Sequence, residues 1–146
     1  MQIKTTRFGV LDVESQDVLD FPTGLLGLEN CRKFVLLADA QNGALGWLQC
    51  VTRPEIALAV VSPRRFVPGY QFRVFRSELQ PLRLERVEEA QVLAIVGKND
   101  HAITLNLKAP LVLNLQRRLA RQVVANSDHP LQHELGLTPP TLKKTA

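Results

Sequence analysis

Apolar and polar residues alternate with a period of two between Thr104 and Leu115. Every odd position is apolar, and the even positions are Thr104, Asn106, Lys108, Pro110, Val112 and Asn114. This pattern is typical of a strand with one buried and one exposed face. Proline has no backbone N–H for a sheet ladder, so the strand is expected to bend or break at Ala109-Pro110.

A helix competes with the second half of that strand. Leu111, Leu115, Leu119 and Val123 recur every four residues, which predicts one apolar face on a helix over 111–124. The local pattern leaves both structures open.

Other short apolar or alternating stretches predict further strands. They lie at residues 2–13, where Gly9 marks a bend, and at 17–21, 33–38, 46–51, 56–61 and 91–97. Asn42-Gly43 predicts a tight hairpin between two of these strands.

Between 61 and 91 the pattern is less regular. Part of 64–76 is expected to be strand, because Phe72 and Val74 alternate with other residue types, and 77–89 is expected to form a loop or a short helical turn. Seven or eight short strands without regular strand–helix alternation predict an all-β fold. We expect a small barrel or sandwich of antiparallel strands with one or two helical turns.

Residues 21–29 form an irregular, glycine-containing loop between two predicted strands. Pro22 fixes one backbone angle, while Gly24 and Gly27 permit conformations closed to other residues. Leaving a leucine in water costs roughly 1.5–3 kcal/mol. Leu25, Leu26 and Leu28 are therefore expected to be tucked under the loop.

Length and composition fit a single globular domain. The chain has 146 residues, 45% hydrophobic and 22% charged. We expect a domain over 1–126 and a C-terminal tail over 127–146 that is partly helical or frayed, with one helical turn at 131–135 and frayed final residues. The chain is expected to be cytoplasmic, because no apolar run approaches the roughly 20 residues of a membrane helix. Cys31 and Cys50 are expected to be free thiols.

Charge is distributed unevenly along the chain. Residues 1–62 carry five Lys/Arg and seven Asp/Glu, whereas 63–146 carry thirteen and seven. A solvated basic surface explains this excess, and an acidic partner is the alternative. Arginines and aromatic residues mix at 64–76, which suits a surface that tracks a nucleic-acid backbone and stacks bases. A direct RNA-binding β-barrel is therefore the alternative function.

Residues typical of catalytic or cofactor sites are scarce. There is no phosphate-binding glycine loop, and Ser62 lacks the Gly-x-Ser-x-Gly setting of a hydrolase. His129 and His133 are four apart, but nothing gathers the third and fourth ligands of a metal site, so they are interpreted as solvated tail residues. We expect neither an enzyme, a cofactor nor a metal site.

An ordered set of motifs resembles the FliW family of flagellar assembly factors. The motifs are Phe21-Pro22-x-Gly24-Leu25-x-Gly27-x-Glu29, Leu48-Gln49 before an apolar strand that ends at Pro63, Tyr70, Asn106-Leu107-x-Ala109-Pro110-x-x-x-Asn114, and Gln122-Val123. The resemblance spans about residues 3–124. The chain departs from the family pattern at Leu28, Cys50 and Ser62, where packing is mostly conserved.

The resemblance implies a β pseudo-barrel that is not an enzyme. FliW-like proteins bind CsrA, an RNA-binding regulator that represses flagellin translation, and their binding relieves this repression. They also bind newly made flagellin. Two protein partners, no direct nucleic acid, no membrane and a monomeric chain are thus expected. The resemblance also favours strand, turn and strand over 104–124, with Gln122-Val123 on the return.

Two segments are the candidate partner-binding site. The residues are Phe21, Pro22, Gly24, Leu25, Asn106, Ala109, Pro110, Asn114 and Gln122. Turn geometry alone accounts for the glycines. For Asn106, Pro110 and Asn114, a structural role and a binding role stay open. Pro110 is expected to mark where the sheet stops pairing with itself and meets a partner.

Overall fold

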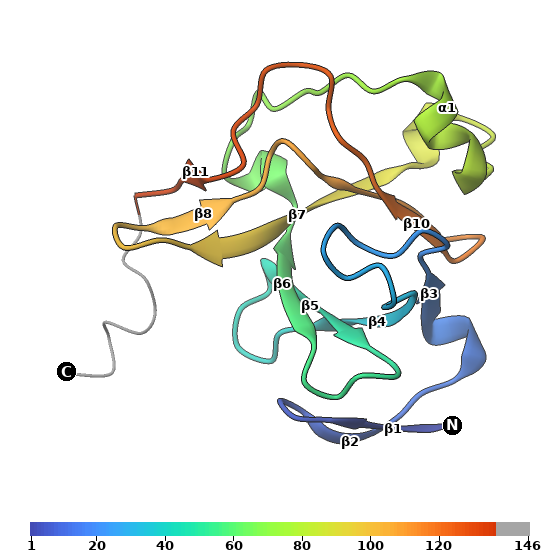
Figure 1. Cartoon of the computed structure of the whole chain (residues 1–146). Helices are drawn as coiled ribbons and strands as arrows, with labels where there is room; N and C mark the ends of the chain where they lie inside the picture. Colours follow the sequence, from blue (N-terminus) through green and yellow to red (C-terminus); the bar gives the residue numbers. More distant parts are fainter. Residues whose placement is uncertain (137–146) are drawn as a thin grey trace.

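The computed structural model describes residues 1–136, which are mostly β (Figure 1). The strands are β1 Gln2–Thr5, β2 Gly9–Asp12, β3 Val18–Asp20, β4 Lys33–Ala38, β5 Leu45–Cys50, β6 Ala57–Val61, β7 Gln91–Lys98, β8 Ile103–Leu105, β9 Leu111–Asn114, β10 Leu119–Gln122 and β11 His133–Glu134. Helix α1 spans Arg76–Leu79, and 3-10 turns lie at Ser15–Asp17, Pro63–Arg65, Gln80–Leu82 and Val87–Glu89. The all-β prediction is confirmed.

Seven of the strands close into a barrel. Their order is β7-β6-β5-β4-β3-β10-β9, and β9 pairs back onto β7. Each of these contacts is antiparallel except that between β3 and β10. Closure leaves no free barrel edge, because every barrel strand has two neighbours.

β7 is long enough to serve two sheets. Its first residues, Gln91–Leu93, pair with β9, and its last residues, Val96–Lys98, pair with β8. β8 pairs in turn with β11. We call β8, β11 and the Val96–Lys98 end of β7 the flap, which projects from the barrel in Figure 1.

The barrel interior is filled by side chains from all around the sheet. Phe21 and Phe34 meet edge to face, with ring centroids 5.2 Å apart. The other buried members of this cluster are Leu19, Leu25, Cys31, Leu48, Cys50, Val60, Leu111, Leu113 and Ala120. The β1–β2 hairpin packs outside the barrel through Ile3, which contacts a separate cluster with Val13 and Val35. Both cysteines are free and buried.

The expected break in the Thr104–Leu115 stretch is present. β8 ends at Leu105 and β9 begins at Leu111, and β9 forms an antiparallel hairpin with β10. Arg118, in the turn of this hairpin, has a left-handed backbone with φ 56°. The competing helix over 111–124 does not form.

The predicted exposed face of that stretch is wrong. Thr104, Val112 and Asn114 are buried, as are their odd-numbered neighbours in β9. The outer face of β9 is covered because Val112 packs with Leu82 and Val123. Period-two alternation marks two different faces, but a second layer can bury both.

Two other expectations fail. Residues 66–75, all within the described chain, contain no strand; Phe72 and Val74 do pack inward, but the segment lacks a neighbouring ladder. The helical turn expected at 131–135 is instead strand β11, because Glu134 and His133 pair with Thr104 and Leu105.

The chain beyond residue 126 continues into the fold as far as the structure describes it. The domain boundary at 126 stays a prediction, and the fraying expected for the final residues of the 127–146 tail lies outside the described residues. Within residues 1–136, no helix is long and apolar enough to cross a membrane.

Candidate functional site

The Phe21–Glu29 loop ends in a tight turn whose tip is apolar and exposed. Leu25 and Leu28 exchange backbone hydrogen bonds of 3.4 and 2.8 Å, and Gly27 between them has φ +81°. Leu26 sits at the tip with 60% of its surface exposed, whereas Leu25 is buried. The expectation that Leu26 is tucked under the loop is therefore wrong. Leu25 packs into the barrel core, whereas Leu26 lies in the turn itself, at the surface.

The base of this loop is fixed by packing and by one glycine. Phe21 is fully buried, and its carbonyl accepts a hydrogen bond from the Gly24 N–H at 2.8 Å. Gly24 has φ +67°, and a Cβ there would lie 2.5 Å from the Glu29 carbonyl oxygen. Only glycine fits both conditions. Pro22, beside it, is exposed.

Gln122 joins this loop to the break after β8. Its side-chain oxygen accepts a hydrogen bond from the Leu26 N–H at 2.8 Å. Its side-chain nitrogen donates to the Ala109 carbonyl at 3.1 Å. The structure thus brings together three parts of the predicted site that are far apart in sequence, with one amide side chain as the link.

The break itself is a hydrogen-bonded turn. The Asn106 side-chain oxygen accepts hydrogen bonds from the N–H groups of Lys108 and Ala109, at 3.2 and 2.9 Å. A short polar side chain that satisfies nearby backbone groups is the usual structural use of asparagine in a turn.

A return segment, residues 123–130, covers the break, and we call it the strap. The N–H groups of Leu107 and Lys108 both donate to the Pro130 carbonyl, at 3.1 Å each. The strap's Val123 donates to the Pro110 carbonyl at 3.0 Å. The backbone groups that leave the sheet at the break are therefore hydrogen bonded to the strap of the same chain.

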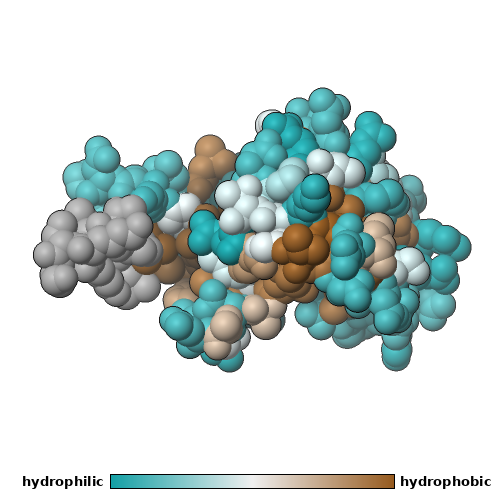
Figure 2. Space-filling view, turned by 90° about the horizontal axis from the view of Figure 1, so that it is seen from below, coloured by the Kyte–Doolittle hydropathy of each residue, from teal (hydrophilic) through white to brown (hydrophobic). Residues whose placement is uncertain are grey.

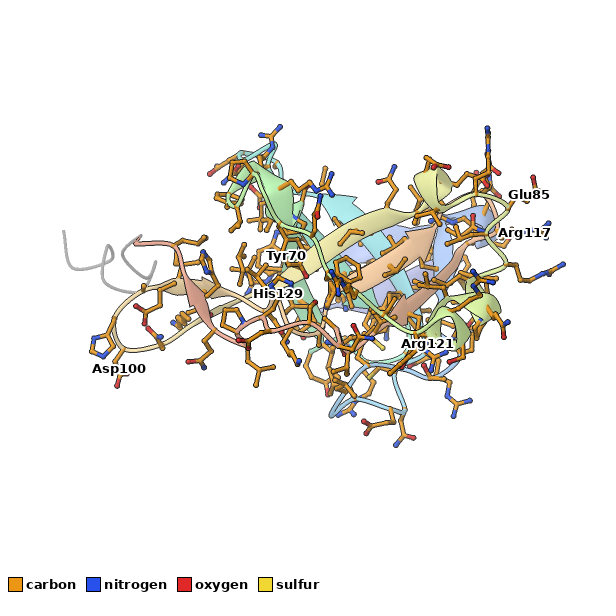
Figure 3. The ribbon with its side chains drawn as sticks, turned by 90° about the horizontal axis from the view of Figure 1, so that it is seen from above. Tyr70, Glu85, Asp100, Arg117, Arg121 and His129 are labelled. Atoms are coloured by element: carbon orange, nitrogen blue, oxygen red, sulfur yellow. The ribbon has the colours of Figure 1, made fainter. Side chains whose placement is uncertain are left out.

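Tyr70 holds the strap in place through His129, which is a strap residue, and the two side chains lie next to one another in Figure 3. The Tyr70 hydroxyl donates to the Leu107 carbonyl at 2.7 Å, and burial raises the pKa of this tyrosine to about 12. The His129 and Tyr70 rings meet edge to face, with their centroids 5.0 Å apart. The Nε2 atom of His129 lies 2.6 Å from the Gln71 carbonyl oxygen. His129 is therefore a packed residue rather than the solvated one expected.

Asn114 does not belong to this group. It lies at the opposite end of the β9–β10 hairpin from Gln122, since Leu119 pairs with Asn114 and Gln122 pairs with Leu111. Its side-chain nitrogen donates to the Leu82 and Arg83 carbonyls at 2.9 and 3.4 Å, and only 4% of the residue is exposed. Asn114 fastens the 80–84 segment to the barrel.

Sequence reasoning missed the exposed apolar residues near this site. Besides Leu26, these are Val124, 47% exposed, and Phe75, 67% exposed. The strap that carries Val124 lies beside the segment before Phe75, because the Asn126 N–H donates to the Arg73 carbonyl at 2.7 Å. An Arg121–Glu78 ion pair of 3.4 Å ties α1 to β10. No sequence signal separates these side chains from core leucines and valines, because exposure depends on what packs above them.

The polar side chains of the described residues do not gather into a metal-binding cluster. Among residues 1–136, no group of three or more His, Cys, Asp or Glu is arranged to hold a metal ion. The features gathered here are a rigid turn, an amide link and exposed apolar side chains, which are features of a surface that binds another protein.

The chain is similar in sequence to the FliW protein family over most of its length. The model of that family, described as FliW protein, matches residues 2–135. The flagellar assembly factor FliW of Bdellovibrio bacteriovorus is 39% identical over 131 residues, which cover 88% of this chain and 75% of that protein. The one of Geotalea uraniireducens is 38% identical over 130 residues, covering 88% and 79%.

A solved structure has the same fold. The crystal structure of a flagellar assembly factor FliW superposes with a TM-score of 0.84 at 26% identity, covering 95% of this chain and 98% of that one. The shared fold therefore extends over nearly the whole of both chains.

Proposed function

This chain belongs to the FliW family of flagellar assembly factors, and we propose on that basis that it works by exchanging two protein partners. One partner is a CsrA-type translational regulator, which the chain antagonises so that flagellin translation is no longer repressed. The other is flagellin, which the chain binds in a chaperone-like manner in the cytoplasm.

One observation carries the proposal at the level of residues: Leu26 is exposed on a turn that is held rigid. Its backbone N–H is fixed by Gln122, its neighbours Leu25 and Leu28 bond to each other, and Gly27 N donates to the Glu29 carboxylate at 2.8 Å. An exposed apolar side chain on a pre-organised turn loses little conformational entropy when it is buried by a partner. Such anchors supply much of the binding free energy of an interface.

Partner exchange follows from mass action. If flagellin and the regulator each weaken the other's binding, by overlap or by coupling, free flagellin releases the regulator from this chain. Accumulated flagellin then restores repression of its own translation. Secretion of flagellin reverses the exchange.

The RNA-binding alternative has less support. The stacked pair in the arginine–aromatic segment, Tyr70 and Phe72, packs into the core, so these rings are not a platform for bases. A salt titration separates the two functions, because binding to a phosphate backbone weakens steeply as salt rises.

The test is binding of the purified chain to purified CsrA and to purified flagellin, by calorimetry and by co-elution. Leu26→Asp is expected to weaken binding of at least one partner by ten-fold or more, because it places a charge where apolar surface is buried. The matched control is Val10→Asp. Val10 on β2 is 61% exposed against 60% for Leu26, and it lies on the hairpin outside the barrel.

If the Leu26 and Val10 variants bind each partner with equal affinity, the turn is not part of the interface. Failure of the unchanged chain to bind either protein would contradict the proposed function itself.

A further inference from the structure

A second feature of the molecule is an apolar groove between the barrel and the flap. It has a volume of about 880 Å³. Trp47 and Val61 line it from the barrel, Ile103 lines it from the flap, and Leu135 lines it from the position directly after β11. Phe66, 38% exposed, forms part of its wall. In Figure 2, which views the molecule from the side of the β1–β2 hairpin, apolar side chains gather in the middle of the face and hydrophilic ones border them.

The charges in this groove are of one sign. Arg7 and Lys98 line it, and no Asp or Glu is among the lining residues. The Arg7 guanidinium lies over the Trp47 ring, 4.2 Å from the ring centroid. Behind Trp47, the Asp39 carboxylate is already engaged, since it accepts hydrogen bonds from Trp47 Nε1 and from two backbone N–H groups. The groove therefore combines an apolar floor with cationic margins.

We propose that this groove binds an extended, acidic and apolar peptide segment of another protein. A bulky apolar side chain of the segment lies against Trp47 and Ile103, and a carboxylate a few residues away pairs with Arg7 or Lys98. Opposite charge at the margin and apolar surface at the centre are the usual division of roles in such interfaces. The volume falls within the roughly 300–1,000 Å³ of typical ligand sites, enough for one or two large side chains.

The charge of the groove favours an acidic occupant, because Arg7 and Lys98 attract carboxylates. By sequence alone, residues 137–146 have no Asp or Glu and do not match that chemistry. The groove also shares no residue with the Leu26 turn, the break or the strap. This binding site is thus separate from the one invoked for the proposed function.

Trp47 provides the measurement, because it is the only tryptophan in the chain. The full chain is titrated with the probe acetyl-Gly-Leu-Phe-Asp-Leu-Glu-Gly-amide, which has no tryptophan of its own, and the indole fluorescence is followed. Two further probes carry lysine in place of the acidic residues, or serine in place of the apolar ones. We expect a saturable change with the acidic apolar probe and at least ten-fold weaker binding of the other two.

Variants of the chain locate the binding. Lys98→Glu is expected to weaken the acidic apolar probe at least ten-fold, because it reverses a charge at the margin. The matched control, Lys4→Glu, makes the same change at an exposed position of β1 that does not line the groove, and is expected to leave binding unchanged. Leu26→Asp is also expected to leave it unchanged, which separates this site from that of the proposed function.

Four results would overturn the proposal. The first two are the absence of any saturable fluorescence change, and equal affinity for the acidic and the lysine probes. The third is an equal loss of probe affinity in the Lys98 and Lys4 variants. The fourth is tighter binding of dodecanoate, or of a synthetic peptide of residues 137–146, than of the acidic apolar probe. The last result would assign the groove to a lipid carboxylate or to the chain's own segment. Thermal midpoints of both lysine variants establish that each is folded.

Discussion

The Phe21–Glu29 loop and the 104–114 segment are both candidate binding segments in the sequence, but they use their unusual residues in opposite ways. The loop exposes an apolar side chain, Leu26, at its tip. The segment buries a polar one, Asn114, with only 4% of its surface exposed. Irregular residues therefore indicate where the backbone turns or leaves a sheet, whereas the layers packed around a segment decide which of its side chains remain accessible.

The reason lies in what covers each segment. In the loop, the inward side chains Phe21 and Leu25 fill the barrel interior, and the tip is left at the surface. Over β9, the 80–84 segment forms a second layer, and Asn114 satisfies its carbonyls. A buried amide must be hydrogen bonded, so this polar residue is there to fix the layer.

The largest expected effect is that of Gly24→Ala on stability. The variant combines a left-handed backbone with a Cβ placed 2.5 Å from a backbone oxygen of Glu29. We expect a loss of about 3 kcal/mol in the free energy of unfolding, measured by urea denaturation. Gly27→Ala is the control, since Gly27 has φ +81° but nothing within 4 Å of a Cβ, and it is expected to cost only about 1 kcal/mol. Equal losses would show that the contact with Glu29 does not matter.

Asn114→Ala is expected to destabilise the chain by about 2 kcal/mol, because it leaves the carbonyls of the covering layer without a donor. Asn106→Ala removes hydrogen bonds in a more accessible turn and is expected to cost about 1 kcal/mol. Partner affinity measured on folded Asn114→Ala protein should be unchanged. If Asn114→Ala weakens partner binding without lowering the thermal midpoint, Asn114 contributes to the interface.

Gln122→Ala has a smaller expected effect on stability, of about 1 kcal/mol, but a clear effect on the turn. Its side chain fixes the Leu26 N–H, so hydrogen exchange of that amide should accelerate at least ten-fold. Affinity for the partner that contacts Leu26 should fall with it, since the turn is no longer pre-organised. An unchanged exchange rate would show that the turn holds itself without Gln122.

The smallest effect at neutral pH, and the only one confined to alkaline solution, concerns Tyr70. Its pKa of about 12 in the folded chain lies above the ordinary value of 10, because burial disfavours the phenolate. The unfolded chain therefore loses this proton first, and the stabilising contribution is present below pH 10 and lost between 10 and 12. Tyr70 is the only tyrosine, so the absorbance of the phenolate follows it directly. A midpoint near 10 in the folded protein would contradict its burial.

Much of the fold could be predicted from the sequence because it depends on local pattern. Alternating and apolar runs placed most strands, Asn42-Gly43 marked the β4–β5 hairpin, and Pro110 marked the break between β8 and β9. Two local patterns gave wrong predictions, a strand within 64–76 and a helical turn at 131–135. Phe72 and Val74 alternate on an extended segment that lacks a ladder, and residues 131–135 contribute strand β11.

The candidate site was predicted in its parts and not in its arrangement. The motifs named Gln122, Ala109 and the loop at 21–29, but only the structure joins them through one amide side chain. Leu26 was expected inside, and for Asn114 a structural role and a binding role were both left open.

The sequence by itself determined the β character, the chain breaks and the family, because backbone preferences and side-chain periodicity act over a few residues. Barrel closure by β7 and β9, the strap over the break and the exposure of Leu26 were decided by tertiary structure. Each of these depends on contacts between residues far apart in the chain. Whether a side chain is exposed is a property of what packs over it, and no local pattern carries that information.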